Sequence, residues 1–266
     1  MRVSLRFHSI APLIPFTIAC LTGFALSQLQ VPQLNRLVNQ NTQVPLSQMK
    51  EELKSERTYL MMARSTPTFG YENVIANWTF LRFLQYFGDD PARDATGYDL
   101  SPEYFEVILK LDPRFLQAYF YLSGSTSLYA GKPERTIALM SQGLAQISPQ
   151  VPYQSYYIWR YKGIDELLFL GDSQAAQKSF EMAAKWADTY EDAESQQVAQ
   201  FSRRTAEFLA RNPKSKYAQV AAWGMFLFTA LDERSRQIGI NRIRALGGDV
   251  VMDAEGRMRI VPPKED

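Results

Sequence analysis

The stretch that decides the fold runs from FYLSG at residues 120–124 to GKPERTIALMSQGL at residues 131–144. The same spacing recurs in WRYKG at residues 159–163 and GDSQAAQKSFEMAA at residues 171–184. In both copies an aromatic residue is followed four positions later by glycine, and a second glycine marks the turn before another helical run. Repetition at a fixed spacing is typical of proteins built from stacked supersecondary units. Each copy therefore predicts one helical hairpin, and the two copies predict hairpins packed in register.

Small residues within the copies predict where two helices approach closely. Gly124 and Gly163 have no Cβ, so we expect the second helix of each hairpin to lie close to the first there. Met140 and Phe180 occupy equivalent positions and are expected to fill the space between the helices. This pattern resembles the tetratricopeptide repeat, in which large, glycine, small and aromatic residues follow one another along two antiparallel helices. The resemblance covers about residues 71–231.

The outer parts of this region carry more divergent copies. WTFL at 78–81 and YFEVILKLDP at 104–113 form a first hairpin, with residues 88–100 inserted where a short turn belongs. Residues 198–209 and 218–231 predict a fourth pair of helices, and terminal repeats commonly diverge because one of their faces meets water. Plain helical hairpins without the tetratricopeptide superhelix are the alternative architecture.

The sequence predicts a last helix at residues 233–245, and the residues after it favour strands. Gly247 and Gly248 follow it directly, and glycine is the residue that most often ends a helix. Beyond them, two β-prone runs flank a turn and predict a small hairpin. We therefore expect an all-α, tetratricopeptide-like solenoid over residues 49–246, followed by a β-hairpin and tail at residues 247–266.

The N-terminal segment, residues 1–29, predicts a transmembrane anchor. Residues 10–29 carry no charged side chain, and a helix of that length rises about 30 Å, the thickness of the hydrocarbon core. Arg2 and Arg6 precede the run, so the positive-inside rule places the N-terminus in the cytoplasm. The body is then expected in a periplasm or a thylakoid lumen. A cleaved signal peptide is the alternative, and residues 30–48 predict a flexible linker.

Composition excludes several classes of chemistry. His8 and Cys20 are the only histidine and cysteine, so the region after residue 30 has no imidazole or thiol for zinc binding, a Ser-His-Asp triad or a disulfide. The formal net charge is +1, which leaves no basic excess for nucleic acid. We expect no catalytic residues, no cofactor, no metal site and no small-molecule substrate. A carboxylate-based glycosidase of the cell envelope is the enzymatic alternative.

Aromatic residues supply the candidate binding surface. If the repeat register holds, the first helix of each hairpin turns one set of side chains toward the inner surface of the superhelix. Tyrosine and arginine suit protein interfaces because they combine a large contact area with a polar tip. The expected partner-binding residues are Tyr86, Tyr121, Tyr129, Tyr157 and Arg160. The alternative is that these side chains only pack one helix against another.

The resemblance implies a function in protein binding, because the concave surface of tetratricopeptide proteins holds an extended peptide or a partner helix. We expect a non-catalytic, membrane-anchored scaffold that binds a protein partner in the assembly or maintenance of a membrane complex. Respiratory and photosynthetic complexes are both compatible with this layout. A stable structural subunit of a large membrane complex is the other non-enzymatic alternative.

Overall fold

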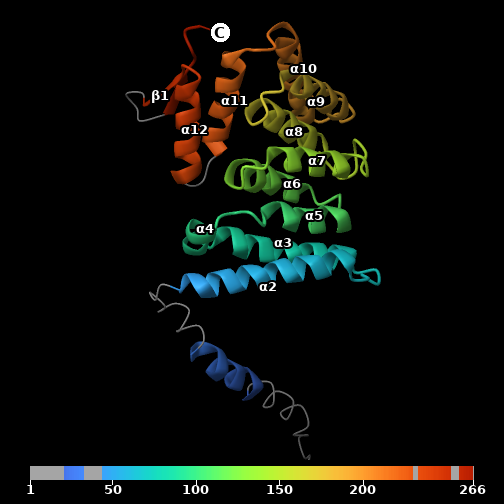
Figure 1. Cartoon of the computed structure of the whole chain (residues 1–266). Coiled ribbons are helices and arrows are strands. Elements are labelled where there is room, and N and C mark those ends of the chain that lie inside the picture. The colour runs from blue at the N-terminus through green and yellow to red at the C-terminus, as the bar shows by residue number, and fades with distance from the viewer. Residues whose placement is uncertain (1–20, 33–43, 230–232, 253–257, 266) are drawn as a thin grey trace, which may run out of the picture. The chain divides into compact units, whose positions relative to one another are not determined.

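The computed structural model describes residues 21–32, 44–229, 233–252 and 258–265 (Figure 1). The chain divides into two units, residues 1–49 and residues 50–266. In the first unit, residues 21–32 form a helix. None of the helices in these described ranges combines the length and the apolar character that a membrane crossing requires. The predicted anchor lies outside them over residues 10–20.

The second unit is mostly helical, as expected from the sequence. The helix α2 spans Leu46–Ser65 and leads into it. The remaining helices, in chain order, are α3 (Glu72–Gly88), α4 (Asp90–Thr96), α5 (Ser101–Leu111), α6 (Leu116–Leu122), the π-helix η1 (Ser123–Tyr129), α7 (Pro133–Leu144), α8 (Tyr156–Leu168), α9 (Ser173–Ala187), α10 (Ala193–Arg211), α11 (Lys216–Thr229) and α12 (Glu233–Ala245).

Neighbouring helices pack as successive hairpins (Figure 1). The helix α3 lies against α5, η1 against α7, α8 against α9, and α9 against α10. The short helix α4 occupies the predicted insertion between α3 and α5, where the Asp89 side chain caps it by accepting from the Ala92 N–H at 3.2 Å. These helices bury their apolar stripes against neighbouring hairpin partners, and α11 packs on both α12 and α8.

Large aromatic side chains form the main core. Phe83 on α3, Phe105 on α5 and Tyr119 on α6 are fully buried, and the Phe83 and Phe105 rings meet edge to face with centroids 4.6 Å apart. Burial of such a side chain stabilises the fold by about 1.5 to 3 kcal/mol. Met140 on α7 is also fully buried in this cluster, in the position expected from the repeat pattern.

The predicted close approach at Gly163 is confirmed. A Cβ placed there would lie 3.2 Å from the Phe180 ring and 3.3 Å from the Ser179 Cβ. Phe180 itself is 5% exposed, so it fills the space between α8 and α9 as expected. The absence of a side chain on Gly163 is what lets these two helices lie so close.

The equivalent expectation for Gly124 is wrong. A Cβ on Gly124 would meet no atom within 4 Å, because this residue lies in η1. The Ala130 N–H donates to the Ser125 carbonyl oxygen at 3.0 Å, five residues back. A π-helix turn holds more residues than an α-helix turn, so it shifts the register that the spacing predicts. Gly143 on α7 provides a close approach in this hairpin, since a Cβ there would overlap the Tyr119 hydroxyl.

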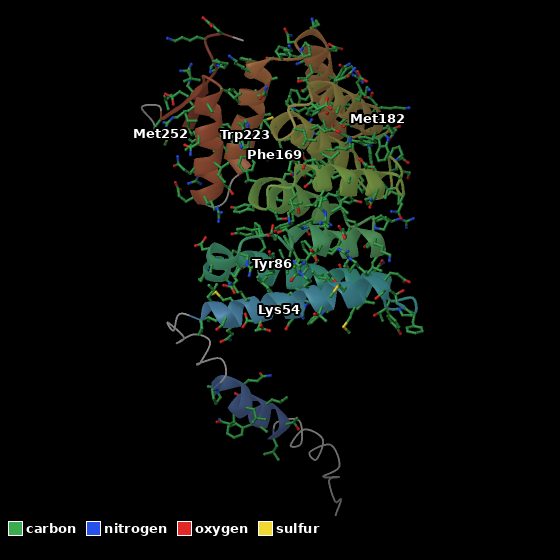
Figure 2. All side chains as sticks on the ribbon, in the orientation of Figure 1. Lys54, Tyr86, Phe169, Met182, Trp223 and Met252 are labelled. Atoms are coloured by element: carbon green, nitrogen blue, oxygen red, sulfur yellow. The ribbon has the colours of Figure 1, made fainter. Side chains whose placement is uncertain are left out.

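The C-terminal hairpin is confirmed. Strands β1 (Asp249–Met252) and β2 (Met258–Val261) pair antiparallel, with Val250 opposite Ile260. Ile260 packs against α11, where a Cβ on Gly224 would lie 3.0 Å from it. Trp223 of the same helix meets Phe169, just after α8, with ring centroids 5.5 Å apart (Figure 2). A two-stranded hairpin is marginal alone, and these contacts attach it to the helices.

The end of α12 has the predicted glycine cap. Gly247 has a φ of +85°, a left-handed conformation that side chains with a Cβ rarely adopt. Its N–H donates to the Arg244 carbonyl oxygen at 2.9 Å, and the Gly248 N–H donates to that of Ile243 at 3.0 Å. These two bonds form a Schellman motif, which satisfies the last carbonyl groups of the helix before the strand begins.

Overpacking at Gly163 is expected to destabilise the fold. Gly163→Leu should lower the free energy of unfolding by about 1 to 3 kcal/mol, because α8 and α9 must separate to admit the side chain. Gly124→Ala is the control, and its free energy of unfolding should stay within about 1 kcal/mol of the wild-type value, because the added Cβ meets open space. Denaturant unfolding followed by circular dichroism measures both, and equal losses for the two variants would contradict the packing described.

Candidate functional site

Tyr86 lies inside the fold and supports the inserted segment. It is 7% exposed, and its hydroxyl accepts from the Leu100 N–H at 3.2 Å and donates to the Gly97 carbonyl oxygen at 3.4 Å. The Arg93 guanidinium lies 3.9 Å from the centroid of its ring. Burial raises the pKa of the Tyr86 hydroxyl. These contacts make Tyr86 a link between α3 and the chain before α5.

Tyr121 and Tyr129 make aromatic contacts with other helices. The Tyr121 ring meets Phe80 of α3 edge to face, with centroids 5.4 Å apart. The Tyr129 ring lies 4.8 Å from that of Tyr98, and its hydroxyl shares a hydrogen bond with the Ser235 hydroxyl of α12. Both tyrosines are half-buried, so part of each remains open to a partner.

Tyr157 and Arg160 share one face of α8, directed at α10. The Tyr157 hydroxyl donates to Glu194 at 2.9 Å, and Arg160 donates to the Ser202 hydroxyl at 2.9 Å. The structure brings these two side chains together, while Tyr86 and Tyr129 flank the inserted segment. All five expected residues thus have contacts within the domain, and their binding of a partner stays a prediction.

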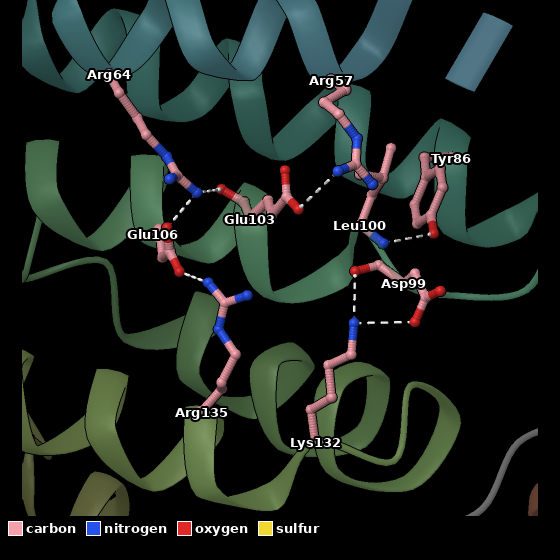
Figure 3. A network of polar contacts seen from close by, with 9 residues as sticks. All are labelled: Arg57, Arg64, Tyr86, Asp99, Leu100, Glu103, Glu106, Lys132 and Arg135. Carbon is pink, nitrogen blue, oxygen red and sulfur yellow. Dashed lines mark hydrogen bonds and ion pairs between the residues drawn. The ribbon is translucent and has the colours of Figure 1, made fainter. Parts of the chain in front are cut away.

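A different surface has the features of a binding site. A groove of about 430 Å³ lies between α2, α5 and α7, helices that hold none of the five expected residues. Figure 3 shows the Arg64, Glu106 and Arg135 side chains reaching toward one another from these three helices. The groove is lined by Arg64, Glu106, Leu109, Lys110, Arg135, Ala138, Leu139, Gln142, Gly143 and Gln146.

The charged side chains of this groove, which we call the basic groove, leave a positive excess. Its lining holds three cations, Arg64, Lys110 and Arg135, and one carboxylate, Glu106, so its formal charge is 3 − 1 = +2. Both arginines pair with Glu106, one with each carboxylate oxygen. The basic groove is therefore cationic although the whole chain is nearly neutral, with a formal net charge of +1.

The cations of the basic groove retain hydrogen-bonding capacity. A guanidinium has five N–H donors, so one carboxylate cannot satisfy two of them. Arg64 also donates to the Glu103 carbonyl oxygen at 3.5 Å. Its Nε is buried without an acceptor among the described residues, but the side chain as a whole is 36% exposed, so part of the guanidinium stays within reach of a ligand. Lys110 donates to the Arg64 carbonyl oxygen at 2.8 Å, which uses one of its three donors.

Apolar side chains form the base of the basic groove and polar ones its edge. Leu109 is 3% exposed and Leu139 is 6% exposed, whereas Gln142 and Gln146 are exposed. Gly143 contributes backbone only, because Tyr119 fills the space that a side chain there would need. An apolar base with a few convergent polar groups is the usual composition of a ligand site, and the volume falls within the roughly 300 to 1,000 Å³ typical of such sites.

A second groove offers an internal comparison. It lies between α9 and α10 and has a volume of about 490 Å³. Its lining includes Lys185 and Arg203 but also Glu181, Asp188 and Glu207, so its formal charge is 2 − 3 = −1. The two grooves are similar in size and opposite in charge, and this acidic groove therefore serves as a matched control for the basic one.

A buried polar cluster connects the hairpins but is closed to solvent. Asp165 on α8 is 0% exposed and accepts from the Ser123 and Ser127 hydroxyls of η1 at 2.6 and 2.7 Å. Burial raises the pKa of its carboxyl to about 7. The adjacent Glu166 pairs with Lys162 and accepts from Ser179 at 2.6 Å. These bonds satisfy groups that would otherwise be costly to bury.

Within the described ranges, no group of three or more His, Cys, Asp or Glu side chains could hold a metal ion. Comparison of the chain with protein-family models, curated proteins and solved structures finds no match. The inference of function therefore depends on the sequence and on the geometry of the basic groove.

Sequence reasoning did not find the basic groove because its residues are far apart in the chain. Arg64, Glu106 and Arg135 come from three helices and are separated by long intervals of sequence. Arg64 also precedes the repeat region, so the repeat pattern carries no signal for it. The ion pairs of Arg64 on α2 and Arg135 on α7 with Glu106 on α5 show that these charges come together only in the folded chain.

The stability of the fold is expected to depend on pH through Asp165. Between the ordinary aspartate pKa of about 4 and the folded value of about 7, the folded state binds a proton that the unfolded state has released. Stability is therefore highest at low pH within this window and falls by up to about 1.4 kcal/mol per unit as pH rises.

Asp165→Asn should remove this slope, because an amide accepts from the serines without ionising. Urea unfolding at pH 5 and pH 8 measures how much the free energy of unfolding changes between the two pH values. Asp188→Asn, which alters an exposed carboxylate, is the control and should show the same change as the wild type. An unchanged slope in Asp165→Asn would show that Asp165 does not titrate in this range.

Proposed function

We propose that this protein is a non-catalytic, tetratricopeptide-like scaffold, anchored to a membrane by residues 10–29, that binds a protein partner through the basic groove. The partner is a component of a membrane complex, respiratory or photosynthetic, whose assembly or maintenance the scaffold assists. The body of the protein then lies in a periplasm or a thylakoid lumen.

The repeat architecture is supported by the equivalent roles of two hairpins. Phe180 in one second helix and Met140 in the other occupy equivalent positions and are both buried. Ala183 and Gly143, the small residues that follow, are buried as well. Stacked hairpins of this kind present extended surfaces, and such surfaces suit protein partners better than small substrates.

The observation that carries the proposed binding function is the unused donor capacity of the basic groove. Two arginines share one carboxylate, and a lysine stands beside them on a surface with an apolar base. Arginine is among the residues most often important in protein interfaces. The Asp165 carboxyl, whose pKa burial raises, is fully buried and so cannot touch a substrate in this conformation.

The membrane anchor is supported by sequence alone. Residues 10–29 have no charged side chain, and Arg2 and Arg6 precede them. The uncharged run has the length of a bilayer-spanning helix, and the arginines favour a cytoplasmic N-terminus. A scaffold tethered in this way meets membrane complexes at a high effective concentration, which favours weak and reversible contacts.

Purification of the tagged full chain from its native membrane tests this function. We expect a defined set of membrane-complex proteins to be retained, in substoichiometric amounts for an assembly factor and in fixed stoichiometry for a structural subunit. Gly163→Leu disturbs the packing of the hairpins and should therefore reduce the recovery of these membrane-complex proteins. Absence of any retained protein under mild detergent conditions would contradict the proposed function.

A further inference from the structure

We infer that the basic groove between α2, α5 and α7 binds an extended, acidic segment of a protein partner, with Arg64 and Arg135 pairing with its carboxylates. This inference rests on the proposed function and adds the chemical class of the ligand. It also places the partner on the second helices of the hairpins, α5 and α7, rather than on the helices that carry the expected tyrosines.

The position of Glu106 indicates what kind of group the groove holds. Its two carboxylate oxygens are each paired with a different guanidinium, from α2 on one side and α7 on the other (Figure 3). The chain thus already holds one carboxylate between these two arginines. A carboxylate from a partner meets the same planar donors, and arginine binds such groups through paired N–H bonds.

Charge favours a further anion in this groove. With Glu106 included the lining is still +2. The neighbouring cations Lys132 and Arg57 each lie beside an acid of their own, Asp99 and Glu103. A ligand carboxylate would reduce the excess positive charge that Arg64, Lys110 and Arg135 leave in the groove.

The length of the groove favours a peptide over a simple anion. A free phosphate would use the guanidinium groups alone, whereas the lining continues from Arg135 along α7 to Gln146 just beyond its end, about 16 Å of helix. An extended segment covers that distance with about five residues, so its acidic side chains can reach the arginines while another lies over the exposed Ala138. Gln142 and Gln146, exposed at the edge, offer amide groups to the backbone of such a segment.

The test is a titration of the full chain in detergent with a dye-labelled hexapeptide of alternating glutamate and leucine, followed by fluorescence anisotropy. We expect saturable binding below about 1 mM that weakens as salt is added. The matched peptide with glutamine in place of each glutamate should bind at least about tenfold more weakly. Failure of the acidic peptide to bind, or equal binding of both peptides, would overturn the inference.

Variants assign the binding to the basic groove. The double variant Arg64→Gln, Arg135→Gln should bind the acidic peptide about tenfold more weakly or worse. The control double variant Lys185→Gln, Arg203→Gln in the acidic groove should bind it with unchanged affinity. Glu106→Gln should tighten binding several-fold, because the competing carboxylate is removed. A gain of affinity cannot result from misfolding, so a loss or no change in Glu106→Gln would count against the inference.

Three further outcomes are distinguishable. Displacement of the peptide by inorganic phosphate, but not by chloride at equal ionic strength, would make this a phosphate site and overturn the peptide assignment. If the arginine double variant still retains the native partner set, the inference fails together with the assignment of partner binding to the basic groove, while the scaffold function through another surface stands. If the peptide binds as expected and no native protein is retained, the groove assignment stands and the scaffold function fails.

Discussion

Close approach of helices at residues without side chains is the constraint on which the stack depends. Gly163 brings α8 against Phe180, and Gly143 brings α7 against the hydroxyl end of Tyr119. Protein interiors are packed to crystal density, so a side chain at either position would force neighbouring helices apart. Because each hairpin packs on the next, a displacement at one glycine would move the surfaces formed by several helices.

The basic groove shares helices with this packing. Gly143 is one of its lining residues, and Tyr119 fills the space that a side chain on Gly143 would need. The helix α2 then supplies Arg64, and α7 supplies Arg135, to the same carboxylate on α5. The fold therefore converts charges that are scattered along the sequence into one local cationic surface.

Much of the fold was predictable because its determinants are local. Periodic apolar residues and turn glycines identified the hairpins, and Gly247 with the following β-prone runs identified the end of α12 and the C-terminal strands. The π-helix was not predictable, because it accompanies a tertiary contact. Ser123 and Ser127 bond to Asp165, which is about forty residues away in the sequence. Nothing in the local pattern around Gly124 signals that partner.

The candidate site was less predictable than the fold. The repeat pattern identified helices correctly, but it assigned binding to aromatic side chains that also serve packing. Tyr86 is an example, since its hydroxyl is held by the backbone before α5. Long-range ion pairs such as those of Glu106 depend on how helices from separate hairpins meet, and sequence spacing carries no information about them.

Zero-length crosslinking shows whether a partner's carboxylate lies in the basic groove. A carbodiimide joins a lysine amine to a carboxylate only when the two are in contact, and Lys110 lines the basic groove as Lys185 lines the acidic one. We expect mass spectrometry of the crosslinked native complex to find an amide between Lys110 and an Asp or Glu of the partner. Crosslinks at Lys185 or other lysines, with none at Lys110, would contradict it.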